Sequence, residues 1–107
     1  MKKNFNGNIN NEMIGKKVHL YGWVQKKRNL GGLIFIDLRD RSGIVQLVVK
    51  PDNKFYDDAE SLKNEYVIEV LGTVVERENK NKNIKTGDIE IEVDNLIILN
   101  KSIELPF

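Results

Sequence analysis

Apolar and polar residues alternate with a period of two along most of this chain, and this pattern constrains its fold more than any other feature. Successive side chains of a β-strand point to opposite faces, so the alternation predicts strands that each bury one face. We expect five strands, at residues 17–28, 33–39, 44–49, 66–76 and 89–99. Gly22 lies in the middle of the first segment, where a glycine lets a long strand bend as a barrel corner requires.

One segment between the third and fourth strands breaks the alternation. Pro51 ends the third strand, and Asp52 or Asn53 is expected to cap a short helix that runs to about residue 64. Five strands with a helix between the third and the fourth follow the order of the OB-fold, a Greek-key barrel. A sandwich normally has more strands and no central helix. The expected fold class is therefore all-β with one short helix, as a five-stranded OB-fold barrel forming a single domain over residues 1–107.

The register of the second and third strands follows from the turn between them. If residues 40–43 form the turn, the numbers of facing residues sum to 83. One face of the hairpin is then entirely apolar and is expected to lie in the core. Its pairs are Leu38 with Val45, Ile36 with Leu47, and Ile34 with Val49.

The opposite face of the same hairpin carries Phe35 close to Gln46. OB-folds bind oligonucleotides or oligosaccharides on this part of the barrel. An aromatic ring there offers a stacking platform for a base, and an amide can donate and accept at the edge of that base. Packing of Phe35 under a loop is an equally open interpretation at this point.

The net charge of +1 conceals an uneven distribution, because 17 basic and 16 acidic residues are separated along the chain. Residues 16–28 hold five basic side chains and no acidic one, whereas residues 52–69 hold six acidic and two basic ones. We expect Lys26, Lys27 and Arg28 to hold phosphate groups, although a solvated strand end is the commoner meaning of such a run.

The composition excludes several kinds of catalytic site. The chain has no cysteine and one histidine, His19, so it cannot form a disulfide, a thiol nucleophile or a two-histidine metal site. It has no phosphate-binding glycine loop and no serine-nucleophile motif. We therefore expect no catalytic residue and no metal site in this domain. No apolar run is long enough to span a membrane, which predicts a cytoplasmic protein without a membrane partner.

Four segments together resemble a known family. The segments 22–24, 30–41, 43–46 and 86–90, with Lys27 and Arg28, closely resemble the N-terminal anticodon-binding domain of bacterial aspartyl-tRNA synthetases. The resemblance covers essentially the whole chain, and its stretch from Leu30 to Gln46 is the most specific part.

The resemblance implies roles for individual residues. In the family, the aromatic that matches Phe35 stacks on the middle anticodon base, a uracil, and the glutamine that matches Gln46 hydrogen-bonds to it. The arginine matching Arg28 contacts the anticodon loop, and the acid matching Glu90 lies close to a flanking anticodon base. The loop after the fourth strand also approaches the anticodon in the family. That loop adds two candidates here, Asn81 and Asn83.

The resemblance also implies what the parent enzymes do. They activate aspartate with ATP and Mg²⁺, transfer it to tRNA, and form homodimers through a catalytic domain. The signature segments of that domain are absent from these 107 residues. The chain is therefore expected to be a tRNA-binding module of an aspartate–tRNA ligase, with no cofactor of its own. A free-standing binder of single-stranded nucleic acid and a protein-interaction module remain as alternatives.

Overall fold

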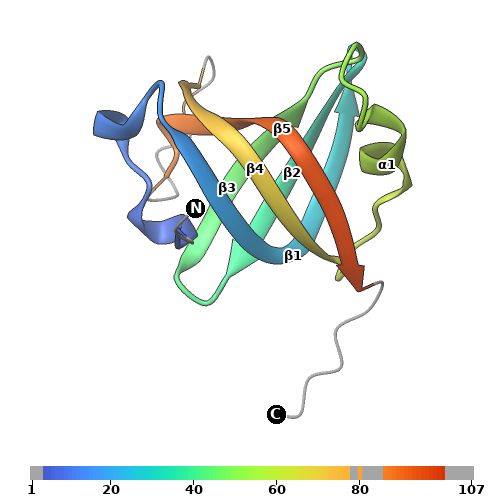
Figure 1. The fold of residues 1–107 in the computed structure, drawn as a ribbon, viewed down its shortest axis with the longest axis horizontal. Coiled ribbons are helices and arrows are strands. Elements are labelled where there is room, and N and C mark those ends of the chain that lie inside the picture. Colours follow the sequence, from blue (N-terminus) through green and yellow to red (C-terminus); the bar gives the residue numbers. More distant parts are fainter. Residues whose placement is uncertain (1–3, 78–79, 81–85, 101–107) are drawn as a thin grey trace.

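The computed structural model describes residues 4–77, 80 and 86–100, which form a closed five-stranded barrel (Figure 1). The strands are β1 (Lys17–Leu30), β2 (Leu33–Asp40), β3 (Gly43–Val49), β4 (Val67–Glu76) and β5 (Ile89–Asn100). Their order around the barrel is β1-β2-β3-β5-β4, and β3 and β5 pair in parallel while the other neighbours pair antiparallel. Helix α1 (Tyr56–Ser61) follows β3 and precedes β4. The expected fold class is confirmed.

The helix is shorter than the sequence predicts. The expected cap is wrong, because Phe55 occupies the N-cap of α1 without a side-chain hydrogen bond. Asn53 instead shapes the turn before the helix, where its Oδ1 accepts a hydrogen bond from the Phe55 N–H at 2.7 Å. The helix itself ends at Ser61, because Leu62 adopts an extended backbone and is only 1% exposed. Burial of this leucine in the core takes the chain out of the helix before residue 64. Figure 1 shows α1 outside the barrel, where the Tyr56 hydroxyl donates to the Gly32 carbonyl in the β1–β2 turn at 2.9 Å.

The predicted register of the β2–β3 hairpin is confirmed at every pair, from Ile34 with Val49 to Asp40 with Gly43. The six side chains assigned to its inner face are all fully buried. They pack with inward residues of β1, β4 and β5 in one core. Burial of apolar area on this scale is the main favourable term in folding a small barrel.

The sequence does not predict the two short 3₁₀ turns that precede the barrel, η1 (Asn6–Asn8) and η2 (Asn11–Met13). Asn6 is fully buried at the β2–β3 end of the barrel. Its Nδ2 donates to the Leu38 carbonyl at 2.9 Å and to the Gly43 carbonyl at 3.3 Å, while its backbone N–H donates to Asp40 Oδ2 at 2.9 Å. These bonds attach the N-terminal segment to the hairpin and satisfy polar groups that are removed from water.

A three-residue polar cluster lies on the outer face of β1 and β4. Glu69 Oε2 accepts hydrogen bonds from His19 Nε2 at 2.5 Å and from the Tyr21 hydroxyl at 3.0 Å. Hydrogen bonds from His19 and then Tyr21 lower the pKa of Glu69, and the bond to Glu69 raises the pKa of Tyr21. The cluster links two neighbouring strands of the closed barrel.

Within the described part of the chain, no helix has both the length and the apolar character needed to cross a bilayer.

We predict that Asn6→Ala destabilises the fold by about 1–3 kcal/mol, because the buried Leu38 carbonyl and the half-buried Gly43 carbonyl lose their donor. Urea unfolding measures this as a lower midpoint with an unchanged slope. Asn8→Ala is the matched control, since Asn8 is exposed in the same 3₁₀ turn. Equal stability of the two variants would contradict a role for Asn6 in holding the N-terminal segment.

We also predict that the stabilising effect of Glu69 depends on pH. The folded state lowers the pKa of this carboxyl from its ordinary value of 4.5. The ionised carboxyl therefore stabilises the fold at pH values above 4.5, and this contribution is lost as the pH falls through the lowered pKa. The difference in unfolding free energy between the wild type and Glu69→Gln should therefore shrink between about pH 6 and about pH 3. Glu12→Gln, at an exposed position on η2, is the control. A difference that stays constant over this range would refute the prediction.

Candidate functional site

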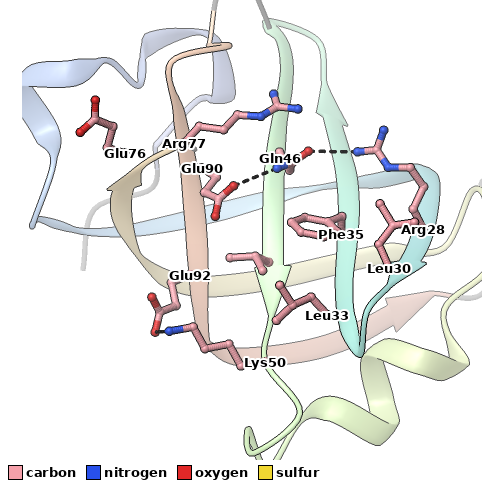
Figure 2. Close-up of a pocket in the computed structure, with 11 residues that line it drawn as sticks. Arg28, Leu30, Leu33, Phe35, Gln46, Lys50, Glu76, Arg77, Glu90 and Glu92 are labelled. Atoms are coloured by element: carbon pink, nitrogen blue, oxygen red, sulfur yellow. Dashed lines mark hydrogen bonds and ion pairs between the residues drawn. The ribbon is translucent and has the colours of Figure 1, made fainter. Parts of the chain in front are cut away.

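An open groove with a volume of about 400 Å³ crosses the outer face of the barrel (Figure 2). Side chains from all five strands or from the residues that directly follow them converge on it. They are Arg28, Leu30, Leu33, Phe35, Gln46, Val48, Lys50, Glu76, Arg77, Glu90 and Glu92. Its volume falls in the range usual for ligand-binding clefts. Figure 2 shows the Phe35 ring in the middle of the groove, between Gln46 and Leu33.

A β-bulge in β1 brings Arg28 to this face. Residues 18, 20, 22 and 24 of β1 all point into the barrel and are buried, so strict alternation would also turn Arg28 inward. The pairing with β2 shifts by one residue between Val24 and Lys26, and beyond the shift Lys26 lies opposite Asp37 and Arg28 opposite Phe35. Facing residues of an antiparallel pair share one face of the sheet, so the bulge turns both cations outward.

Hydrogen bonds join residues of four strands across the groove. Arg28 Nη2 donates to Asp37 Oδ1 at 3.1 Å and to Gln46 Oε1 at 3.0 Å. Gln46 Nε2 in turn donates to Glu90 Oε1 at 2.9 Å, as Figure 2 shows.

These partners determine the orientation of the Gln46 amide. A guanidinium can only donate and a carboxylate can only accept, so the amide oxygen must face Arg28 and the amide nitrogen must face Glu90. The residue is only 5% exposed. The bonds to these two partners use one of its two N–H donors and one of the two lone pairs on its oxygen.

The two sides of the groove differ in charge. Arg28 stands on the β1 side, whereas Glu76, Glu90 and Glu92 stand on the β4 and β5 side together with the cation Arg77. Glu92 pairs with Lys50 at 3.4 Å, and Glu76 pairs with Lys80 at 2.8 Å and raises the pKa of that lysine. An anionic ligand is therefore attracted to the β1 side of the groove.

Arg77 carries the one guanidinium Nε, among the described residues, that is buried without a hydrogen-bond partner. It directly follows β4, and its backbone N–H donates to the Asp88 carbonyl at 3.0 Å. This donor adds unsatisfied hydrogen-bonding capacity at the rim of the groove.

Of the residues selected from the sequence, Phe35, Gln46, Arg28 and Glu90 come together in the groove. Lys26 lies on the same outer face but does not line the groove. Asn81 and Asn83 lie outside the described residues.

The structure separates the basic residues of 16–28 from one another. Lys27 does not face the groove, because it lies opposite the inward residue Ile36 and its Nζ donates to the Glu60 carbonyl on α1. The five basic residues of 16–28 do not form one cluster either. Lys16 and Lys17 lie near the other end of the 14-residue β1, where Lys17 pairs with Asp94 at 2.8 Å.

Sequence reasoning did not assign several residues that line the groove. Val48 could have been found, since the predicted register places it opposite Phe35. Lys50 and Glu92 could not, because they meet through the parallel pairing of β3 with β5, which leaves no local pattern in the sequence. Within the described ranges, no group of three or more His, Cys, Asp or Glu side chains is arranged to hold a metal ion.

Comparison with known proteins gives consistent matches over the whole chain. The aspartate–tRNA ligase of Exiguobacterium sibiricum is 54% identical over 107 residues, which cover 99% of this chain and 18% of the ligase. The asparaginyl-tRNA synthetase of Pyrococcus horikoshii is 30% identical, with a TM-score of 0.81 over 99% of this chain and 24% of that structure. The aspartyl-tRNA synthetase of Entamoeba histolytica shares the fold, with a TM-score of 0.86 at 22% identity. The chain thus spans about 18% of the length of the curated relatives it matches.

The family described as the OB-fold nucleic acid binding domain matches residues 18–99, a range that begins in β1 and ends in β5. This range contains the complete barrel apart from the first residue of β1 and the last residue of β5, and it contains all the residues that line the groove. The chain therefore belongs to the family of OB-fold nucleic-acid-binding domains.

Proposed function

We propose that this chain is the anticodon-recognition module of an aspartate–tRNA ligase. The observation that carries the proposal is the position of the Phe35 ring beside an amide whose orientation is determined by Arg28 and Glu90. The ring supplies a surface on which any base can stack. The Gln46 amide distinguishes between bases through its hydrogen bonds.

The orientation of the Gln46 amide favours uracil over cytosine. Its oxygen has a lone pair left for the N3–H of uracil, and its nitrogen has an N–H left for O4. Cytosine reverses both groups, with an acceptor at N3 and a donor at N4. The amide cannot rotate to suit cytosine without placing its nitrogen against Arg28 and its oxygen against Glu90.

The ligase names of the curated relatives support the wider part of the proposal. In the whole enzyme, aspartate is activated with ATP and Mg²⁺ and then transferred to the tRNA that this module recognises. The enzyme acts in the cytoplasm as a homodimer joined through its catalytic domain. Catalysis and both cofactors belong to that domain. The residues of the groove contribute binding and selection, and they supply no step of the reaction.

Phe35→Ala should weaken binding of an anticodon stem-loop by about 1–3 kcal/mol, because the stacking surface is lost. Isothermal titration of the chain with a synthetic stem-loop of aspartate tRNA measures the change. Phe35→Trp is the matched variant, since it keeps a ring and should retain most of the affinity. Unchanged affinity in a Phe35→Ala variant with native circular dichroism would show that the ring does not stack on RNA.

Replacing the middle anticodon uracil of the stem-loop by cytosine should cost about 1–3 kcal/mol with the wild-type chain. With Gln46→Ala the two stem-loops should bind with nearly equal affinity, because the group that distinguishes them is gone. A polypyrimidine strand of equal length is the control. If this strand bound as tightly as the stem-loop, the chain would be a sequence-tolerant single-strand binder.

A further inference from the structure

A row of three cations continues from the groove along the outer face of β1 and β2. Arg28 lies opposite Phe35, Lys26 lies opposite Asp37, and Arg39 follows two residues later on β2. Residues two apart on a strand share a face and lie about 7 Å from each other. Each of three successive positions along this face therefore carries one basic side chain.

The row has little acid to neutralise it. Asp37 is the one carboxylate among the residues of the row and the residues opposite them, and it already pairs with Arg28 at 3.1 Å. Lys26 and Arg39 are both exposed. Arg39 Nη1 donates to the amide oxygen of Gln25, the bulged residue, at 3.1 Å. This bond positions the guanidinium, and no carboxylate in the described part of the chain forms an ion pair with it.

The bulge produces this arrangement. Without the one-residue shift, Lys26 and Arg28 would face the interior, and Lys27 would be the residue of this run that shares the outer face with Arg39. The β-bulge therefore assembles the row from residues that strict alternation would have placed on opposite faces.

We propose that this row is a track for the RNA backbone, on which Lys26 and Arg39 hold phosphates of the nucleotides that flank the recognised bases. The inference rests on the proposed function and extends it from the bases in the groove to the strand that leaves it. Two observations select a polyanion as the occupant. The row is continuous with the groove through Arg28, and its two exposed cations, Lys26 and Arg39, have the charge that attracts a polyanion. The backbone is thereby directed along β2 toward the β2–β3 turn.

Phosphate contacts of this kind contribute affinity without reading sequence. Each neutralised phosphate of a single strand releases counterions and adds about 0.7 to the slope of log affinity against log salt. Removing Arg39 should therefore lower this slope and leave the preference for uracil intact. A purely structural role for Arg39 would change stability and would not change the salt dependence.

The test is a salt series of titrations of the chain with the aspartate anticodon stem-loop and its cytosine variant. Arg39→Gln should lower the slope by about 0.7 and weaken binding roughly five- to tenfold at 50 mM salt. Arg39→Lys should restore the slope, because it keeps the charge. Lys63→Gln removes an exposed charge that lies outside the row and should match the wild type.

The outcomes separate this inference from the proposed function. An unchanged slope in Arg39→Gln, or an equal loss in Lys63→Gln, would overturn the track even if uracil is still preferred over cytosine. Loss of affinity with an unchanged slope would assign Arg39 a structural role and would also overturn it. If the wild type binds both stem-loops equally, the proposed base reading fails, while a lowered slope in Arg39→Gln would still support the track.

Discussion

The whole barrel depends on the pairing of β1 with two different strands. Residues 17–23 of β1 pair with β4, and residues 23–30 pair with β2, so the strand must turn from one neighbour to the other near Trp23. Gly22 permits this turn, since a Cβ at this position would collide with the Arg39 carbonyl. The bulge at Gln25 completes it. The sheet closes on itself because these two neighbouring irregularities bend β1.

The same irregularities and strand pairings that close the barrel also bring the residues of the groove together. The bulge that helps β1 to bend also turns Arg28 toward Gln46. The parallel pairing of β3 with β5 places Gln46 next to Glu90 in the groove. A half-satisfied amide between a cation and an anion is costly to bury unless its partners are held rigidly. The closed barrel supplies that rigidity, because Arg28, Gln46 and Glu90 all stand on its strands.

The local parts of this arrangement could be predicted from the sequence. Hairpin register follows from a short turn and from the need to bury one apolar face, so Phe35, Gln46 and Val48 could be placed on the outer face in advance. The burial of Asn6 could not be predicted, because its partners Leu38, Asp40 and Gly43 are more than 30 residues away along the chain. The end of α1 could not be predicted either, since burial of Leu62 outweighs a local preference for continued helix.

Local patterns of residue types are enough to predict five strands, an apolar core face and an aromatic next to an amide on the opposite face, because period-two alternation and turn residues act over short distances. Which basic residues face the groove side of the barrel follows instead from long-range strand pairing. Lys27 follows the alternation expected after the bulge and contacts α1, whereas Lys26 and Arg28 face outward with Arg39. A one-residue bulge leaves almost no mark in the pattern of residue types, yet it reverses the direction of every side chain that follows it.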